Sequence, residues 1–462
     1  MKLQKIYNAS PIILQNLFCT LYGIKIYLQR YQRRYRYLFE EVIESQYWDK
    51  DKIDEYQNRK FIEIVNHAYF NIRYYRQKYD KFGVNIHQIK DLRDVKKLPL
   101  MSKEDMRLVS QEVARGRNTL KYVNLQTSGS TGTPLLVRVD YEALNMYYAL
   151  WKRYKLQFGI TNRSRKLVFG GKMVVPLKQQ VPPFWRMNYF SNQLYFSTHH
   201  LSKKNIPSIV EKMIAFDPEE IFSYPSALYL IAKYNKNIKI PSLKIINTTS
   251  ENLFKYQRDL IEKVFNCQVR QTYGMVEPAV FFEECNLGKL HHNFEFGFYE
   301  VLDKKGNDAI EGEIIVTGFY NKVMPFIRYK SNDNVVKSIK LCPCGKKSSY
   351  LKCIDGRKED YIITPEGNIV GRMSHIFKGE KLDVVESQFI QRKIDELEIY
   401  IVPSNKYSKD AEKFILRNLK ERLGTEMKFK IKYVDKISRD QSGKLRTVIS
   451  KLDKNSIDQE SV

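Results

Sequence analysis

A run of hydroxyl-bearing residues and glycines between two apolar segments is the first feature that could perform chemistry. Glycines let backbone N–H groups approach an anion closely, and hydroxyl groups add donors with little bulk, so such a loop can hold phosphate. No lysine lies inside it and no Gly-Lys-Ser/Thr closes it, which argues against a P-loop NTPase. Taken alone, such a loop is more often an ordinary turn. The predicted phosphate-binding residues are Thr127, Ser128, Gly129, Ser130, Thr131, Gly132 and Thr133.

A second segment, Gln271–Pro278, combines an aromatic residue, a glycine and a carboxylate. Tyr273 and Gly274 could lie against a base, and the carboxylate of Glu277 suits Mg²⁺, which prefers oxygen ligands. Read alone, the segment could equally be a junction between a strand and a loop.

Two further polar residues stand where a nucleotide could use them. Asp333 ends a strand-like run that begins at Glu313, and an aspartate there can accept hydrogen bonds from two ribose hydroxyls or simply form a turn. Lys444 follows a Ser-Gly turn, from which it can neutralise charge on a transferring phosphoryl group or remain solvated.

Soft metal ligands gather in a short stretch of sequence. Cys342, Cys344 and Cys353 lie close together, with Cys285 and His291 upstream. These residues are enough for a tetrahedral Zn²⁺ site, although they could also be free thiols. Six cysteines in 462 residues are too few for a disulfide scaffold, which favours a reduced, cytoplasmic protein.

The chain is strongly basic, with 78 Lys and Arg against 52 Asp and Glu. This excess of cations could attract polyphosphate, anionic lipid or nucleic acid, but the charges are spread along the chain as on a solvated surface. Near the N-terminus, the apolar stretch Ile12–Leu28 is interrupted by polar residues and is shorter than the ~20 residues that span a bilayer. Arg and Tyr are then interleaved from Arg30 to Tyr37. The stretch predicts a helix that lies on the inner membrane surface or packs on the protein body.

Secondary-structure patterns predict an α/β protein that positions these groups. Apolar residues at helical spacing in the first ninety or so residues indicate helices, and beyond them short apolar runs alternate with helical patterns. A strand-rich region spans 298–336, a polar segment at 356–360 suits a hinge, and the last hundred residues suggest a small α+β unit. The predicted divisions are a helical extension (1–95), a large domain (96–357) and a small C-terminal domain (358–462).

The four nucleotide-related segments, in this order, resemble the adenylate-forming superfamily of acyl-CoA synthetases, adenylation domains and luciferases. The resemblance is greatest to the phenylacetate-coenzyme A ligase branch, and there to proteins of surface-polysaccharide gene clusters. It implies a multi-layered N-terminal domain and a small mobile C-terminal lid. It also implies that the loop binds the ATP phosphates and that Tyr273 and Gly274 lie against adenine. Glu277 would bind Mg²⁺, and Asp333 would bind the ribose. Lys444 would act during adenylation, and Arg357 is included in the nucleotide-binding set. A recurring Glu-Cys, His and Cys-x-Cys-Gly pattern implies a structural zinc on Cys285, His291, Cys342 and Cys344, with Cys353 as a substitute for His291.

The resemblance implies an enzyme that activates a small carboxylic acid with ATP and Mg²⁺, releases pyrophosphate and passes the acyl group to an acceptor. The acceptor could be a sugar, a carrier protein or coenzyme A, since the segment after Asp360 lacks the glycine-rich turn of coenzyme A ligases. An aryl-coenzyme A ligase is the first alternative. A non-enzymatic basic protein that binds membrane or nucleic acid is the second, but Glu277, Asp333 and Lys444 argue against it and no nucleic acid is expected.

Overall fold

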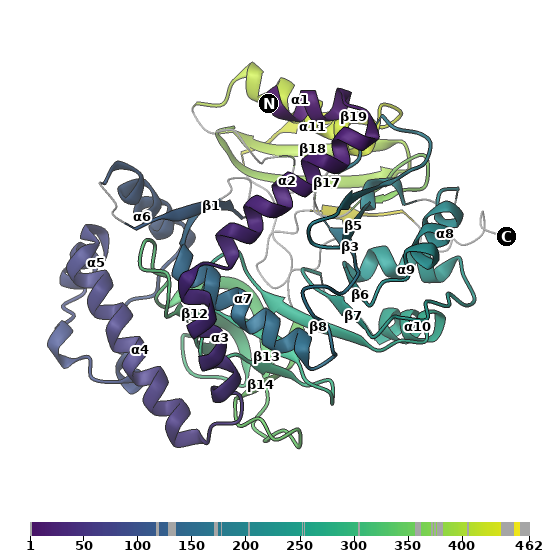
Figure 1. Ribbon diagram of the computed structural model, residues 1–462. Coiled ribbons are helices and arrows are strands. Elements are labelled where there is room, and N and C mark those ends of the chain that lie inside the picture. The colour runs from purple at the N-terminus through teal and green to yellow at the C-terminus, as the bar shows by residue number, and fades with distance from the viewer. Residues whose placement is uncertain are drawn as a thin grey trace.

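The computed structural model describes residues 2–116, 120–127, 135–170, 174–176, 178–201, 204–251, 253, 255–303, 305–355, 362–370, 373, 376, 382–403, 406–435 and 448–452. Helices dominate the first hundred residues, as predicted (Figure 1). The stripe of Phe61, Ile64, Val65 and Ala68 is buried, because residues three and four apart share one face of a helix. The helices are α1 (Lys2–Ala9), α2 (Ile12–Arg30), α3 (Arg33–Ser45), α4 (Lys50–Asn71) and α5 (Arg73–Lys81), followed by the 3₁₀ turns η1 (Ile86–Gln88) and η2 (Leu92–Lys97).

A twelve-stranded sheet forms the centre of the molecule, in the order β11-β12-β13-β14-β10-β9-β8-β7-β6-β3-β5-β4. Its strands β8, β7, β6, β3 and β5 are parallel, and α8–α10 flank them on the right of Figure 1. Their apolar side chains form one core with these helices, as the alternating pattern predicts for α/β layering. The elements are β3 (Lys166–Gly170), β4 (Trp185–Asn188), β5 (Gln193–Ser197), η3 (Thr198–His200), α8 (Ile206–Phe216), β6 (Glu220–Ser223), α9 (Pro225–Lys233), β7 (Ile245–Thr248), α10 (Lys255–Phe265) and β8 (Val269–Gly274).

The other half of the sheet is antiparallel and shares its core with α3–α7. Ser102 begins α6 with a capping box, in which Ser102 and Asp105 satisfy each other's backbone N–H groups. Asp140 caps α7 by accepting a hydrogen bond from the Ala143 N–H. The elements are α6 (Lys103–Arg115), β1 (Tyr122–Gln126), β2 (Leu136–Asp140), α7 (Tyr141–Leu156), β9 (Phe281–Glu284), β10 (Leu290–His292), β11 (Gly297–Leu302), β12 (Glu311–Gly318), β13 (Tyr329–Lys337) and β14 (Tyr350–Asp355).

A buried ion pair fastens α3 to α7 inside this core. Arg153 of α7 lies 2.5 Å from Glu295, and the two side chains are 4% and 0% exposed. The same carboxylate accepts a hydrogen bond from Ser45 at the end of α3, and Arg153 also donates to the carbonyl of Val42. Charges this deeply buried need such partners, because desolvation is costly.

The C-terminal part has a sheet and a core of its own. Four strands in the order β19-β18-β17-β20 pack with α11, which confirms the predicted α+β character. The boundaries at 95 and 357 stay predictions; β14 ends at Asp355 and residues 356–361 lie outside the described part. The elements are β15 (Ile362–Ile363), β16 (Ile369–Val370), β17 (Val384–Lys393), β18 (Glu396–Pro403), α11 (Lys409–Leu423), β19 (Lys428–Tyr433) and β20 (Val448–Ser450).

Candidate functional site

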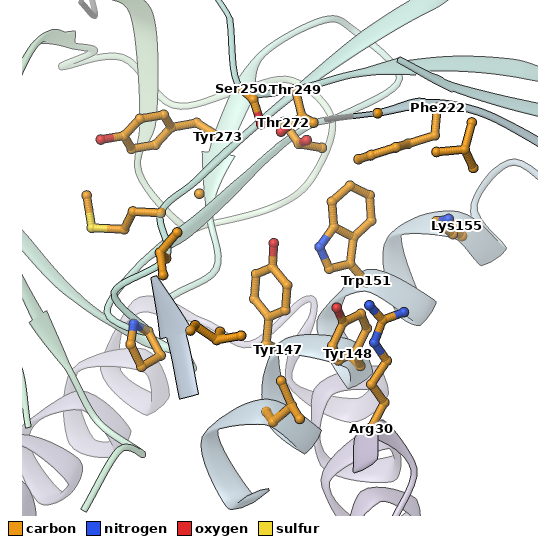
Figure 2. A pocket seen from close by; sticks show the side chains of 18 of the residues that line it. Arg30, Tyr147, Tyr148, Trp151, Lys155, Phe222, Thr249, Ser250, Thr272 and Tyr273 are labelled. Atoms are coloured by element: carbon orange, nitrogen blue, oxygen red, sulfur yellow. The ribbon is translucent and has the colours of Figure 1, made fainter. Parts of the chain in front are cut away.

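A cavity of about 710 Å³ lies where the carboxyl ends of β6, β7 and β8 meet α7 and the β1–β2 hairpin. In open α/β sheets this edge is where ligands bind, because loops diverge there and leave a crevice. Figure 2 shows Tyr147 and Trp151 rising from α7 toward Thr249, Ser250 and Thr272 at the strand ends. The cavity therefore joins elements that are far apart in the sequence.

Four of the predicted nucleotide-binding residues line this cavity and come from three elements. They are Thr127, Tyr273, Gly274 and Asp333. The Tyr273 hydroxyl, at the end of β8, donates a hydrogen bond of 2.9 Å to the carboxylate of Asp333 on β13. Gly274 leaves room beside Tyr147, whose hydroxyl would lie 3.5 Å from an added β-carbon.

Asp333 differs from the prediction in one respect, because it lies within β13 and not at a strand end. The pairing of β12 with β13 shifts register between Glu313 and Ile315, and Asn332 has a φ of 63°. A bulge of this kind re-aims side chains. Ser331 holds the bulge by accepting a hydrogen bond from the Asp333 N–H and donating one to the carbonyl of Ile314.

Glu277 also lines the cavity, in the turn that follows β8. It is 9% exposed, and the Tyr329 hydroxyl donates a hydrogen bond of 3.1 Å to one carboxylate oxygen. A second oxygen on a carboxylate can accept further bonds or bind a cation. The arrangement suits a hard cation such as Mg²⁺, which carboxylate oxygens ligate.

The phosphate-binding prediction rests largely on residues outside the described part of the chain. Thr127 is buried and closes the β1–β2 hairpin: its hydroxyl accepts from the Leu135 N–H, and its own N–H donates to the Leu135 carbonyl. Thr127 therefore lies at the cavity wall, at the end of β1. Ser128, Gly129, Ser130, Thr131, Gly132 and Thr133, together with Arg357 and Lys444, lie outside the described residues.

Sequence reasoning missed the face of α7 that lines the cavity. Tyr147, Tyr148, Trp151 and Lys155 recur at helical spacing and all contact this space. From α2, the Arg30 guanidinium lies 4.1 Å from the centre of the Tyr148 ring, a cation–π contact at the cavity wall. The spacing in α7 was a usable signal, but the direction of its aromatic face depends on the sheet that packs against it.

Two lysines, Lys155 and Lys166, line the cavity. Lys155 pairs at 2.8 Å with the fully buried Glu220. Burial, and then the charge of Lys155, lower the pKa of Lys166 to about 8. An anionic group in the cavity would stabilise the charged form of Lys166.

Ser250 carries local backbone strain at the cavity wall. Its φ of 71° lies in the left-handed region that glycine adopts most easily. Such strain concentrates at functional sites, where surrounding structure holds the residue in place.

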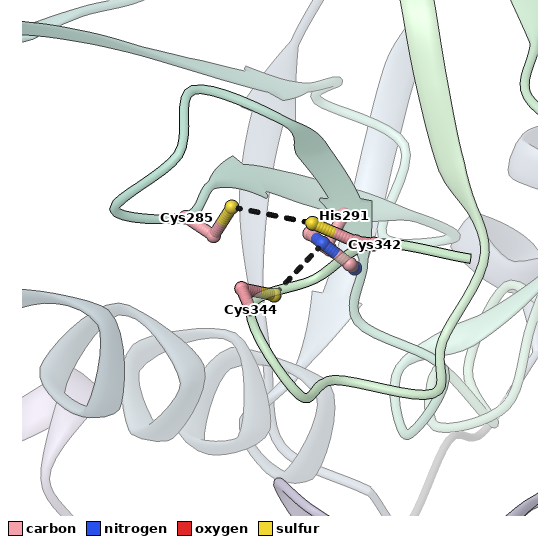
Figure 3. Close-up of side chains that lie close together, drawn as sticks. All are labelled: Cys285, His291, Cys342 and Cys344. Atoms are coloured by element: carbon pink, nitrogen blue, oxygen red, sulfur yellow. Dashed lines mark hydrogen bonds between the residues drawn. The ribbon is translucent and has the colours of Figure 1, made fainter. Parts of the chain in front are cut away.

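Cys285, His291, Cys342 and Cys344 form a separate cluster, and their side chains point toward one another (Figure 3). Their ligand atoms all lie within 4.8 Å of one another. Cys285 Sγ lies 3.9 Å from Cys342 Sγ, and Cys344 Sγ lies 3.4 Å from His291 Nε2. Tetrahedral zinc with ordinary bond lengths separates two sulfurs by roughly 3.8 Å and a sulfur from a nitrogen by roughly 3.5 Å.

The surroundings of the cluster also suit a metal. His291 Nδ1 lies 3.2 Å from the carbonyl oxygen of Ser348, the kind of outer contact that orients a ligating imidazole. Cys353 is exposed on β14, and among the described residues the cluster contains His291 in its place. The donor set and its spacing therefore fit a closed four-ligand site.

Comparisons with known proteins agree with this architecture. The family model of the CapK C-terminal domain matches residues 362–451. Protein CapK of Staphylococcus aureus is 33% identical over 97% of this chain and all of that protein. Phenylacetate-coenzyme A ligase of Thermus thermophilus is 21% identical over 87% of this chain and 97% of the relative.

Among solved structures, 2-hydroxyisobutyryl-CoA ligase in complex with 2-HIB-AMP and CoA superposes with a TM-score of 0.58. It is 18% identical and the match covers 90% of this chain and 93% of that one, so it shows a shared fold. The CapK match supplies the family, since it is above 30% identity across essentially the whole chain. The chain belongs to the CapK family, in the phenylacetate-coenzyme A ligase-like branch of the adenylate-forming enzymes.

Proposed function

We propose that the cavity activates a small carboxylic acid with ATP, forming an acyl-adenylate and releasing pyrophosphate, before the acyl group passes to an acceptor. The observation that carries the proposal is the convergence of Tyr273, Glu277 and Asp333 on one cavity at the carboxyl ends of parallel strands. The Tyr273–Asp333 hydroxyl–carboxylate pair suits a ribose, and the buried carboxylate of Glu277 suits a metal–phosphate unit.

The reaction requires a carboxylate to attack the α-phosphorus of a polyanion. Mg²⁺, held by Glu277, would supply positive charge against this repulsion. Asp333 accepts hydrogen bonds from the ribose, Tyr273 lies along the base, and the wall formed by α7 holds the acid in line. The family resemblance adds three further parts to the nucleotide site: the loop from Thr127 to Thr133, Arg357 and Lys444. In this proposal Lys444 stabilises charge on the phosphoryl group.

The proposed acceptor belongs to surface or capsular polysaccharide biosynthesis. Support comes from the relative named Protein CapK, which matches over nearly the whole chain. The alternative acceptor is coenzyme A, since relatives named phenylacetate-coenzyme A ligase align at 21–23% identity. Membership in a family of ligases leaves the non-enzymatic alternative without support. ATP use and the low cysteine content, six in 462 residues, support the cytoplasm as the compartment.

We also propose that the cluster of Cys285, His291, Cys342 and Cys344 binds a structural zinc. Four protein ligands leave no open position for water, so the metal would stabilise the fold around β9, β10 and the segment before β14. It would have no step in the reaction.

Acid-dependent release of pyrophosphate from Mg-ATP tests the proposed activity across a panel of aliphatic, aromatic and hydroxy acids. Wild type is compared with Glu277→Ala and Lys444→Ala, and with the exposed pair Lys420→Ala and Glu421→Ala as controls. Release that only the first two substitutions abolish supports adenylation. A protein that binds Mg-ATP but releases no pyrophosphate with any acid, alone or with each acceptor added, contradicts it. Adding coenzyme A or a sugar acceptor separately then distinguishes the two acceptors by the product formed.

A further inference from the structure

Helix α2 presents its apolar side to solvent and its polar side to the protein. Figure 1 shows it as a long diagonal helix at the front of the molecule. Ile13, Leu17, Leu21 and Leu28 are 81%, 49%, 53% and 63% exposed, and their spacing places them on one side of the helix. We call this side the α2 outer face. It comprises Ile13, Leu14, Leu17, Phe18, Leu21, Tyr22 and Leu28.

The opposite side of α2 is bound to the protein by polar contacts. The side chain of Gln15 accepts a hydrogen bond of 2.5 Å from the fully buried Arg186. Asn16 accepts from the Met187 N–H at 2.9 Å, and Thr20 accepts from the Tyr189 N–H at 3.1 Å. A helix on a water-facing surface normally has the reverse orientation.

Close packing fixes this orientation. A β-carbon on Gly23 would lie 2.3 Å from the side-chain amide of Asn188, so any larger residue would have to displace that buried side chain. Rotating the helix to hide its leucines would break three hydrogen bonds and this contact. The contacts on the inner side of α2 therefore keep the α2 outer face exposed.

The apolar surface continues into the loop between β4 and β5. Tyr189 and Phe190 are exposed there, and the Phe190 ring lies 5.1 Å from that of Tyr27 on α2. A contiguous exposed apolar surface is uncommon on soluble proteins and marks a site of contact with a membrane or with another protein. Among the described residues, no helix is long and apolar enough to cross a membrane.

The charge around this surface indicates which partner it meets. The first 39 residues contain no Asp or Glu and seven basic residues, which are Lys2, Lys5, Lys25, Arg30, Arg33, Arg34 and Arg36. The segment Trp185–Ser197 beside α2 also contains no acidic residue. Lys5 on α1 and Lys25 on α2 are exposed, and Lys25 lies one helical turn from Leu21 and from Leu28. Apolar side chains flanked by cations are complementary to a bilayer with anionic headgroups.

A second copy of the chain fits this surface poorly. A two-fold dimer places the same patch on both partners, so the exposed Lys5 and Lys25 of one copy would face those of the other. We propose that the α2 outer face docks on an anionic membrane surface, with the leucines inserted at the headgroup boundary and Lys5 and Lys25 against the phosphates.

This docking would place the cavity near the membrane. Arg30, the last residue of α2, lines the cavity wall, as does the following Tyr31. This consequence rests on the proposed function: an acceptor carried on a lipid could reach the site without leaving the membrane surface. The docking itself does not depend on that activity, because the α2 outer face lies outside the cavity.

Vesicle co-sedimentation tests the docking with the full-length protein. The probes are vesicles of phosphatidylcholine alone and vesicles in which a third of the lipid is phosphatidylglycerol. The test variant is Leu17→Glu with Leu21→Glu, and the matched control is Phe82→Glu with Ile394→Glu, two apolar residues exposed elsewhere. We expect salt-sensitive binding to anionic vesicles, weakened at least about tenfold in the test variant and unchanged in the control.

Two further variants test how much the lysines contribute to vesicle binding. Lys5→Ser and Lys25→Ser should each weaken binding roughly fivefold, while the unfolding midpoint stays that of wild type. Equal binding of wild type to neutral and anionic vesicles, or no binding to either, overturns the proposal. So does a dimer in light scattering that the leucine variant converts to monomer, because the α2 outer face would then meet a second copy. Pyrophosphate release with soluble substrates, measured in parallel, should be unchanged in the leucine variant, which separates this result from any failure of the proposed activity.

Discussion

At the residue scale, Glu277 is the group on which the proposed chemistry depends most directly. Replacing it by Gln keeps its shape and its hydrogen bond from Tyr329 but removes the charge that a metal needs. Acid-dependent pyrophosphate release should fall about a hundredfold or more, because the metal offsets charge in the transition state. Tyr329→Phe keeps the carboxylate and removes one hydrogen bond, so its loss should be only roughly tenfold. Equal effects of the two substitutions would mean that Glu277 acts by holding Tyr329 and not by its charge.

The metal cluster makes a second prediction at the residue scale. Cys344→Ser should remove one zinc per chain, as measured by elemental analysis, and lower the free energy of unfolding by about 3 kcal/mol or more. Cys353→Ser, at an exposed cysteine outside the cluster, should keep the metal and the stability. A wild-type protein that contains no zinc after purification in its presence, and that a chelator does not destabilise, would contradict the assignment.

The types and order of the nucleotide-site residues were visible in the sequence. The side chains that they contact could be seen only in the folded structure. Tyr273 and Asp333 are sixty residues apart, and nothing local predicts that the hydroxyl of one reaches the carboxylate of the other. The bulge that turns Asp333 toward the cavity depends on how β12 pairs with β13, which is set by contacts between strands.

At the element scale, the attachment of α3 to α7 depends on one buried ion pair. Glu295→Gln keeps the volume but leaves Arg153 buried without a compensating charge, which should cost about 3–5 kcal/mol in urea unfolding. The exposed i,i+4 pair between Arg36 and Glu40 provides the control, and Glu40→Gln should cost no more than about 0.5 kcal/mol. A Glu295→Gln protein as stable as the control would show that the pair is replaceable by neutral hydrogen bonds.

The periodicity of apolar residues predicted where helices lie in the sequence. It did not predict which side of each helix packs on the protein. The stripe in α4 is buried as its spacing predicts, because its outer side is polar. Helix α2 has apolar residues on its outer side and Gln15, Asn16 and Thr20 on its inner side, so an amphipathic reading assigns the wrong face to the core. Of the two alternatives for the apolar stretch Ile12–Leu28, the structure shows packing on the protein body, through contacts of α2 with β4 and α7. Binding to a membrane surface stays a prediction.

At the scale of the whole molecule, the order of the twelve strands could not be predicted. Alternating helices and strands indicated α/β layering, but the sequence does not show that β9, β10 and β14 extend the sheet on the β8 side. Strand order depends on long-range pairing, for which a single sequence carries no local signal. The separate C-terminal sheet was predictable because its strands and helix are contiguous in the sequence.

A buried histidine of the large sheet's side, His199, is influenced by the charge of Arg422 in the C-terminal part. His199 of η3 is buried, and burial first, then the charge of Arg422 on α11, hold its pKa well below its usual value of 6.5. Among the described residues its Nε2 has no hydrogen-bond partner. Protonation would therefore place a second, unsolvated positive charge against Arg422.

The sign of the resulting pH dependence follows from proton linkage. Because the pKa of His199 is lower in the folded state, the unfolded chain takes up the proton first, and stability falls as the pH drops below 6.5. Between pH 7 and pH 5 this group should cost wild type about 2 kcal/mol of unfolding free energy, measured by urea titration. His199→Asn should lack this part of the loss, whereas His87→Asn, at an exposed histidine, should keep it. Parallel pH profiles for wild type and His199→Asn would show that His199 takes up its proton as readily in the folded chain as in the unfolded one, so that neither burial nor Arg422 opposes its charge.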